Sequence, residues 1–136
     1  IGAIASRLAS EIYGLDILFE SAEDDEHNTT RFLLMSATPS VPAAGGDMIT
    51  TLVFQLRSVP AALYKALGGF ATNGVNLTKL ESYIRAGVAE QAQFYMDVQA
   101  HIDDPAMQNA MEELRFYCSK DEVHVLGSYP ASPSRS

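Results

Sequence analysis

The run Asn28-Thr29-Thr30-Arg31-Phe32 brings an amide, two hydroxyls and a guanidinium next to an aromatic ring. A threonine hydroxyl is a poor acid in water, but in a dry pocket it can donate a hydrogen bond, or relay a proton, to a leaving oxygen. Alternatively, Thr30 is a β-favouring residue at the start of a strand. If that strand begins at Thr30, alternation places Thr30 and Phe32 on one face and Arg31 on the other. Asn28 could contact a substrate or fix the loop.

A predicted strand-to-helix junction in the second half of the chain, together with the strand after that helix, offers groups that could bind a small charged ligand. Backbone amides and the positive end of the helix dipole at such a junction suit a carboxylate. Acidic and carbonyl groups can hold an ammonium group. The alternative is an ordinary half-buried strand with no ligand.

The other reactive residue types give little support for a metal or redox site. His27, His101 and His124 share no ligand spacing with one another or with Cys118. The single cysteine excludes an internal disulfide, and its place near the end of a predicted apolar helix indicates a buried thiol. The acidic residues 23–26 are typical of a solvated loop. We therefore expect no metal and no cofactor.

Composition and charge exclude two classes of partner. The formal net charge is -8, and the nine basic residues are scattered along the chain, which disfavours nucleic-acid binding. No apolar run approaches the roughly 18 to 20 residues that a membrane span needs, and no signal-peptide pattern precedes the first helix. Apolar residues make up 47% of the chain and charged residues 19%, as in ordinary soluble domains. We expect a cytoplasmic protein with no nucleic-acid or membrane partner.

The first part of the chain predicts few elements. Residues 3–13 are rich in helix formers and Gly14 supplies a stop, while short apolar runs at 15–19 and 31–35 predict strands. This is too little material to close a core, so it is expected to form one edge of something larger. Residues 38–47 contain two prolines and two glycines, which indicates a linker.

From residue 48 to 130 the pattern predicts strand, helix, strand, strand, helix, strand. Asp104 and Pro105 mark a helix start, and Gly87 is expected near the turn of a hairpin. This order predicts an α+β fold of the ferredoxin-like βαββαβ type, with both helices on one face of a four-stranded antiparallel sheet. The polar tail at 131–136 is expected to be flexible. The predicted strands are 48–57, 77–84, 93–102 and 123–129, and the predicted helices run from Pro60 to Gly74 and from Pro105 to Tyr117.

These motifs together resemble prephenate dehydratase. The run from Asn28 to Phe32 is similar to the Thr-Arg-Phe motif near the end of its catalytic domain. The run from Asn76 to Ser82 resembles the Asn-Leu-Thr-x-Ile-Glu-Ser run of its phenylalanine-sensing ACT domain, and Val59 to Leu63 resembles that domain's Pro-Gly-Ala-Leu turn. The resemblance implies an enzyme of L-phenylalanine biosynthesis that converts prephenate to phenylpyruvate, carbon dioxide and water, driven by aromatisation. It also implies that residues 1–37 belong to an α/β, periplasmic-binding-protein-like catalytic lobe.

The resemblance implies roles for individual residues. Thr30, with Asn28 and Arg31, would be catalytic, and Ser6 and Phe32 would bind substrate. L-Phenylalanine would be the allosteric effector, bound where two ACT domains pair in a homodimer or tetramer. The residues that the resemblance implies for this site, which we call the effector set, are Ala61, Ala62, Leu63, Asn76, Leu77, Thr78, Glu81 and Ser82. Candidates for that interface are Tyr83, Tyr95 and Leu77.

Two residues of the effector region depart from the family pattern. Alanine stands at position 61, where glycine is usual, so a Cβ atom could crowd the ligand. Glu81-Ser82 continues as Tyr83-Ile84 instead of Arg-Pro, which removes a planar charged donor. The affinity for phenylalanine and the sign of its effect therefore stay open.

The chain begins at Ile1 without a methionine, and we expect a C-terminal piece of a longer enzyme with little activity alone. Whether a chorismate mutase domain lies upstream stays open. The main alternative is a freestanding amino-acid-binding module, which would not need residues 1–40. Two further alternatives are the same sensor attached to another aromatic-amino-acid enzyme, and a ferredoxin-like interaction domain without a ligand.

Overall fold

The computed structural model describes residues 2–22, 24, 30–40, 42–84 and 92–132. The chain divides into two compact units, residues 1–35 and 36–136, which we call the N-terminal segment and the sheet domain. Within the described ranges, no helix has both the length and the apolar character to cross a bilayer.

The N-terminal segment has one short helix, α1 (Arg7–Tyr13), which begins later than predicted because Ser6 is extended, with φ -72° and ψ 156°. Gly14 ends the helix as predicted, in the left-handed conformation (φ 61°) that glycine adopts without steric cost. An ion pair joins Arg7 Nη2 to Glu20 Oε1 at 2.6 Å, with both side chains largely in solvent. No described side chain of this unit is buried, so the segment has no core of its own.

The strands predicted at residues 15–19 and 31–35 are wrong, because the described residues of the N-terminal segment contain no strand. A strand is stable only when neighbouring strands satisfy its backbone hydrogen bonds, and this segment provides none. The described residues of the N-terminal segment therefore contain one helix and no strand.

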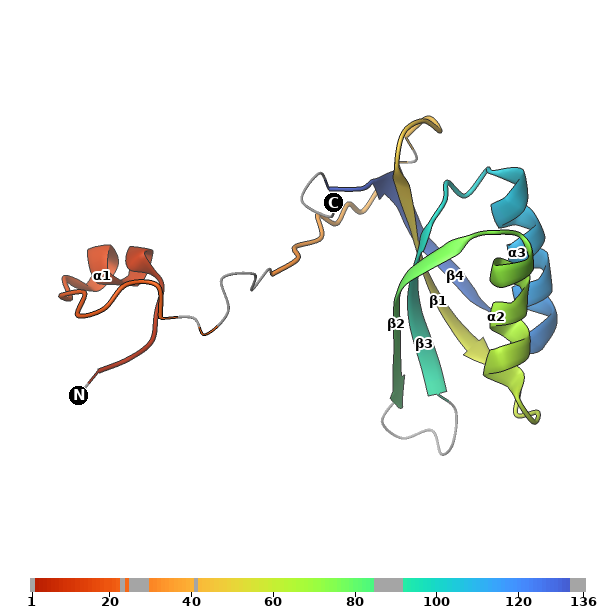
Figure 1. The fold of residues 1–136 in the computed structure, drawn as a ribbon, viewed down its shortest axis with the longest axis horizontal. Coiled ribbons are helices and arrows are strands. Elements are labelled where there is room, and N and C mark those ends of the chain that lie inside the picture. The colour runs from red at the N-terminus through yellow and green to blue at the C-terminus, as the bar shows by residue number, and fades with distance from the viewer. Residues whose placement is uncertain (1, 23, 25–29, 41, 85–91, 133–136) are drawn as a thin grey trace. The chain divides into compact units, whose positions relative to one another are not determined.

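The sheet domain has the ferredoxin-like architecture that the sequence predicts. The four strands form one antiparallel sheet in the order β2-β3-β1-β4, and Figure 1 shows α2 and α3 side by side on one face. The turn expected at Gly87 lies outside the described residues. The elements are β1 (Met48–Leu56), α2 (Ala62–Thr72), β2 (Asn76–Ile84), β3 (Ala92–Gln99), α3 (Pro105–Tyr117) and β4 (Cys118–Pro130).

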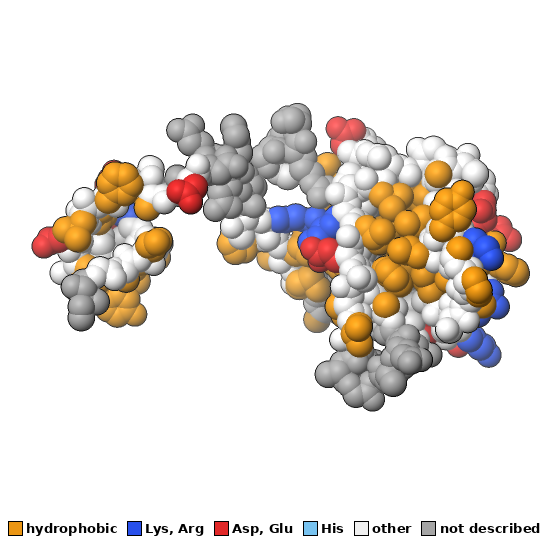
Figure 2. Space-filling view, turned by 60° about the horizontal axis from the view of Figure 1, so that its bottom comes forward, with side chains coloured by type: hydrophobic (Ala, Val, Ile, Leu, Met, Phe, Trp, Pro, Cys, Tyr) orange, Lys and Arg blue, Asp and Glu red, His pale blue; other side chains and the backbone are white. Residues whose placement is uncertain are grey.

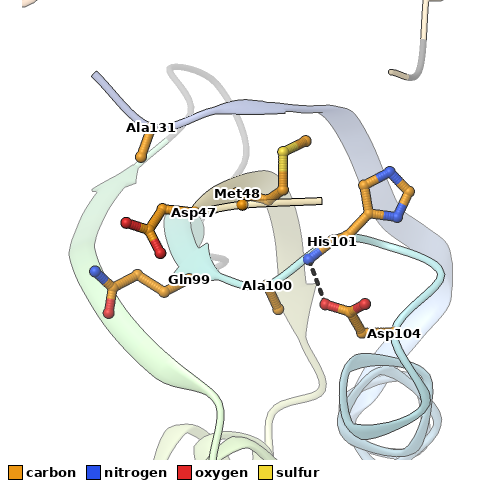
Figure 3. Close-up of a pocket in the computed structure, with 8 residues that line it drawn as sticks. Asp47, Met48, Gln99, Ala100, His101, Asp104 and Ala131 are labelled. Atoms are coloured by element: carbon orange, nitrogen blue, oxygen red, sulfur yellow. Dashed lines mark hydrogen bonds between the residues drawn. The ribbon is translucent and has the colours of Figure 1, made fainter. Parts of the chain in front are cut away.

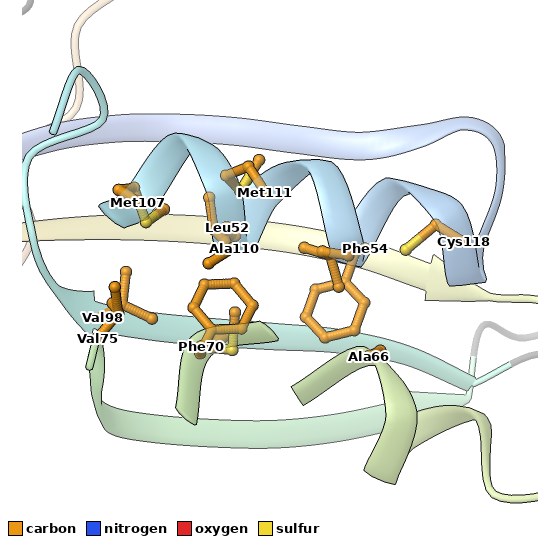
Figure 4. Close-up of a cluster of buried hydrophobic side chains, with 12 residues drawn as sticks. Leu52, Phe54, Ala66, Phe70, Val75, Val98, Met107, Ala110, Met111 and Cys118 are labelled. Carbon is orange, nitrogen blue, oxygen red and sulfur yellow. The ribbon is translucent and has the colours of Figure 1, made fainter. Parts of the chain in front are cut away.

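The core fills the space between the sheet and the two helices (Figure 4). Alternate residues of the strands point into it, and both helices contribute one apolar face. Phe54 stacks on Phe94 with ring centroids 5.4 Å apart. The fully buried members are Leu52, Phe54, Ala66, Phe70, Met96, Val98, Met107, Ala110, Met111 and Leu114.

Arg57 joins the end of β1 to the end of α3. Its backbone N–H donates to the Tyr117 carbonyl at 3.0 Å, its guanidinium donates to the Phe116 carbonyl, and its charge lies 5.2 Å from the centre of the Phe116 ring. A cation at this position satisfies the free carbonyls of the last helical turn and favours the negative end of the helix dipole.

A β-bulge in β2 changes the predicted direction of one side chain. The pairing of β2 with β3 shifts between Leu77 and Lys79, so that Leu77 pairs with Val98 and packs against the core. The sequence prediction put Leu77 on the same face as Tyr83, which is wrong because the extra residue reverses the alternation. Leu77 therefore does not share an exposed surface with Tyr83 and Tyr95.

Candidate functional site

The candidate catalytic residues of the N-terminal segment all lie at its surface. Thr30, Arg31 and Ser6 are exposed, and 88% of the Phe32 side chain faces solvent. No hydrogen bond joins Ser6 to Thr30, and Ser6 precedes α1 without capping it through its hydroxyl. Asn28 lies outside the described residues. The segment thus presents these groups without enclosing them, and the dry pocket that threonine chemistry requires needs further protein around Thr30.

The register of the sheet separates the effector set into two groups. Leu56, at the end of β1, lies level with Ile84 at the end of β2, because Gln55 pairs with Gln93 and Tyr83 also pairs with Gln93. Ala61 to Leu63 follow β1 and therefore lie at the same end of the sheet as Ser82. Asn76 starts β2 at the other end, roughly 20 Å away at about 3.3 Å per residue. One copy of the sheet domain does not bring all eight residues together.

The junction before α2 has an unusual backbone at Ala61. This residue is the N-cap of α2 and has φ 56° and ψ 29°, in the left-handed region. Pro60 does not begin the helix as predicted, because the left-handed turn at Ala61 follows it. The first amides of a helix have no acceptor within the helix, so those of Leu63 and Tyr64 are available to an external carboxylate.

We predict that Ala61→Gly stabilises the sheet domain by about 1 kcal/mol. A left-handed conformation costs an L-residue roughly 1 to 2 kcal/mol, and glycine avoids this steric cost while losing more backbone entropy. Chemical denaturation of both variants measures the change. Ala71→Gly, at an exposed helical position, is the matched control and should destabilise by about 1 kcal/mol. An equal decrease in the free energy of unfolding for both variants would contradict the strain at Ala61.

Three of the five β2 members of the effector set already have polar partners on the sheet. Asn76 Nδ2 donates to Gln99 Oε1 at 2.6 Å, and Thr78 Oγ1 donates to the Asp97 carbonyl at 3.4 Å. Glu81 Oε1 forms an ion pair with Lys79 Nζ at 3.1 Å. β2 is an edge strand, so one side of its backbone has no neighbouring strand in this chain.

Sequence reasoning missed a polar network on the sheet face opposite the helices. Thr51 Oγ1 donates to Asp97 Oδ1 at 2.6 Å and lies 2.8 Å from the Tyr129 hydroxyl. Because the threonine hydroxyl has a single proton, Tyr129 must donate to Thr51. Asp97 is fully buried although it alternates with the core residues of β3. The network depends on the pairing of Thr51 with Asp97 in the sheet register, and the amino-acid sequence alone does not specify that pairing.

The buried thiol predicted at Cys118 is confirmed. Cys118 is buried, and burial raises its pKa to about 11 although the nearby Arg57 charge acts in the opposite direction. The thiol is therefore protonated at neutral pH and a poor nucleophile. Across the described part of the chain, no group of three or more His, Cys, Asp or Glu side chains is arranged to hold a metal ion.

A polar hollow of about 250 Å³ opens at the end of the sheet where β1 begins and β3 ends (Figure 3). His101 and Asp104 lie on one side of it, where the His101 backbone N–H donates to Asp104 Oδ2 at 2.8 Å. The remaining lining residues are Gly46, Asp47, Met48, Gln99, Ala100 and Ala131.

Comparison with known sequences gives consistent matches. A family model described as prephenate dehydratase matches residues 1–40. A bifunctional N-acyl-homoserine lactone acylase/prephenate dehydratase of Komagataeibacter europaeus is 49% identical over 134 residues, which cover 98% of this chain and 47% of the relative. An arogenate dehydratase/prephenate dehydratase of Arabidopsis thaliana, named as chloroplastic, is 38% identical and covers 96% of this chain and 36% of the relative. The chain thus spans half or less of the length of these relatives.

Solved structures agree with the sequence matches. A structure described as a novel type of quorum-quenching acylase is 47% identical, with a TM-score of 0.64 over 71% of this chain and 48% of the other. Prephenate dehydratase from Arthrobacter aurescens in complex with L-Phe is 29% identical, with a TM-score of 0.61 over 69% of this chain and 30% of the other. The family model and these relatives name prephenate dehydratase, and this chain aligns to the C-terminal end of the longer proteins.

Proposed function

We propose that this chain is the C-terminal part of an enzyme that converts prephenate to phenylpyruvate, carbon dioxide and water. In this proposal residues 1–37 complete the catalytic domain, residues 38–47 form the linker and residues 48–130 form the regulatory ACT domain, followed by a tail at 131–136. The observation that carries it is the prephenate dehydratase match over residues 1–40, which include Thr30, in the same chain as a ferredoxin-like domain.

The exposed apolar side chains of the N-terminal segment support a catalytic lobe that extends beyond this chain. A stable soluble unit buries most of its large apolar residues, whereas here they face water. Their burial against further protein would also enclose Thr30 and give it the dry surroundings that its proposed role needs. The exposed residues include Ile4, Leu8, Ile12, Leu18, Phe19, Phe32, Leu34 and Met35.

Within that pocket, Thr30 would give its hydroxyl proton to the ring hydroxyl of prephenate, which departs as water, and Thr30 would regain a proton from solvent before the next turnover. The ring carboxylate leaves as carbon dioxide, and its bonding electrons complete the aromatic ring. Arg31 and Asn28 would hold the substrate's carboxylates and the loop, and Ser6 and Phe32 would line the pocket. Arogenate is the alternative substrate, because several relatives are named arogenate dehydratases.

The sheet domain would bind L-phenylalanine as an effector. The amides at the start of α2 suit its carboxylate, and Glu81 suits its ammonium group. These groups lie at one end of the sheet and Asn76 at the other, so the full effector set would assemble only between two copies. The solved relative in complex with L-Phe supports this ligand.

A second copy of the sheet domain fits the edge at β2. This edge strand is unpaired in the described structure, and exposed apolar residues lie on β2 and on the neighbouring helix α2. Figure 2 shows a broad cluster of apolar side chains at the surface of the sheet domain. We expect a homodimer or tetramer, measurable by sedimentation. The exposed apolar residues of these two elements are Tyr64, Leu80, Tyr83 and Ile84.

L-Phenylalanine is expected to raise the melting temperature of this chain. A ligand at ten times its Kd adds about 1.4 kcal/mol to the free energy of unfolding, which corresponds to roughly 5 to 10 °C for a domain of this size. Differential scanning fluorimetry with millimolar L-phenylalanine measures the shift, and D-phenylalanine and glycine are the controls. An unchanged melting temperature at tens of millimolar would contradict the effector site.

Activity assays separate this proposal from its main rival, a freestanding amino-acid-binding module. The chain extended to the length of its relatives should turn over prephenate, while the chain of 136 residues should not. Arogenate and an N-acyl-homoserine lactone belong in the same assay, because the names of the relatives include these activities. A melting shift with phenylalanine, without turnover of prephenate or arogenate by the extended protein, would favour the rival.

A further inference from the structure

His101 is a buried histidine that the proposed catalysis and effector binding leave unused. It follows the end of β3, and only 2% of its surface is exposed. Alternation along β3 places it with the polar residues, but the turn into α3 carries it inward. A buried imidazole must satisfy both of its ring nitrogens, so its partners reveal what it holds in place.

The two ring nitrogens of His101 contact different parts of the sheet domain. Nε2 lies 2.9 Å from the carbonyl oxygen of Pro42, which can only accept, so Nε2 bears a proton. Nδ1 accepts a hydrogen bond from the backbone N–H of Asp103 at 3.1 Å. The ring is therefore the neutral Nε2–H tautomer, and it links the connector before β1 to the corner between β3 and α3.

That corner is itself held firmly by the neighbouring strands. Thr50 Oγ1 donates to the Ala100 carbonyl at 2.7 Å, and the Ile102 N–H donates to Ser128 Oγ at 3.2 Å. The backbone N–H of His101 donates to the Asp104 carboxylate at the N-cap of α3. The ring thus fixes the connector to β1, β3, β4 and α3 together, not to a single loop.

The same corner lies close to one end of the effector set. Asn76 pairs with Gln99 in the sheet, and their side chains are hydrogen-bonded at 2.6 Å. Gln99 precedes His101 by two residues, and both line the hollow of Figure 3. A displacement of the start of β2 can therefore move Gln99 and the corner, and through the His101 ring it can move the connector at Pro42.

We propose that His101 is a positioning residue that fastens the connector to the sheet domain at Pro42, and that this bond carries the effector response to the catalytic part of the enzyme. The fastening stands on the contacts above, whereas the coupling also rests on the proposed function. The connector is then attached to the sheet domain as far back as Pro42, instead of being unattached up to the start of β1 at Met48.

The fastening is tested on this chain with a nitroxide label on Ala44→Cys, an exposed connector position. Cys118 is buried and should stay unlabelled. His101→Phe keeps the ring shape without a donor, so the label should become several-fold more mobile by electron paramagnetic resonance. His101→Gln can still donate to the Pro42 carbonyl and should restore the slow motion. His124→Phe, at an exposed histidine of β4, is the matched control and should change nothing.

If both proteins fold and the label is equally mobile in the unsubstituted protein and in His101→Phe, the fastening is overturned. If His101→Phe does not fold, nitrogen-15 chemical shifts of the unsubstituted protein decide instead. The fastening requires the Nε2–H tautomer and a scalar coupling from Nε2 to the Pro42 carbonyl. Mixed tautomers without that coupling would overturn it.

The coupling is tested on the protein extended to the length of its relatives. His101→Phe should reduce the fold-change that L-phenylalanine causes in turnover by at least fivefold, in whichever direction the effector acts, while turnover without effector stays within twofold. His101→Gln should restore the response. An unchanged response in His101→Phe would overturn the coupling. Absence of prephenate turnover in the unsubstituted protein would instead contradict the proposed function, and the label experiment would still decide the fastening.

Discussion

Replacing Thr30 by valine should reduce prephenate turnover by the extended enzyme about 10² to 10⁴-fold, the usual contribution of a positioned proton donor. Valine matches threonine in shape but cannot donate to the departing hydroxyl. Thr30 is exposed in this chain and outside any described helix or strand, so the substitution removes no interaction from the sheet domain. Steady-state kinetics with prephenate measure the loss, which should fall on kcat more than on KM.

Two variants separate the Thr30 hydroxyl from general effects of substitution. Thr30→Ser keeps a hydroxyl and should retain much of the turnover. Thr38→Val makes the same chemical change at another exposed threonine and should leave turnover unchanged. Brisk turnover by a folded Thr30→Val enzyme would refute the assignment of Thr30 as the proton donor.

Gly69→Ala should lower the free energy of unfolding of the sheet domain by about 1 kcal/mol, as the balance of an overpacking cost and a gain in helix propensity. Gly69 lies where α2 meets α3, and a Cβ atom there would stand 2.8 Å from the Cβ of Glu113. That atom is fixed to the backbone of α3, so the helices must separate, and such overpacking typically costs about 1 to 3 kcal/mol. The higher helix propensity of alanine returns about 1 kcal/mol. Urea denaturation measures the balance.

The neighbouring glycine provides the control. A Cβ atom at Gly68 would meet nothing within 4 Å, so Gly68→Ala should stabilise α2 by up to about 1 kcal/mol. Both variants replace a glycine with alanine at neighbouring positions of α2, so they differ mainly in what the new methyl group contacts. Similar unfolding free energies for both would show that α2 and α3 do not approach closely at Gly69.

Sequence patterns predicted the sheet domain well because local and tertiary preferences agree there. The strand predicted at 93–102 forms as β3, and its alternate residues Phe94, Met96 and Val98 lie in or against the core. Asp104 and Pro105 begin α3 as predicted, although the Asp104 carboxylate accepts from the His101 N–H instead of capping the helix. Strand pairing, helix length and burial all favour the same fold, so the pattern was sufficient.

The patterns were insufficient wherever the structure depends on residues distant in sequence. The apolar run at residues 15–19 favours a strand only if neighbouring strands exist, and the described N-terminal segment has none. The bulge that turns Leu77 into the core is an irregularity of pairing with β3. Likewise, the burial of His101 follows from the approach of Pro42, and the assignment of the catalytic and effector residues still awaits the experiments above.

The two ends of the ferredoxin-like fold lie side by side. Met48, the first residue of β1, pairs with Pro130, the last residue of β4, and the Ala131 N–H donates to the Asp47 carbonyl at 2.7 Å. A module whose entry and exit coincide can be spliced into a surface loop of an unrelated host without stretching either partner. The same adjacency permits circular permutation, so this fold is suited to insertion as a portable module into other proteins.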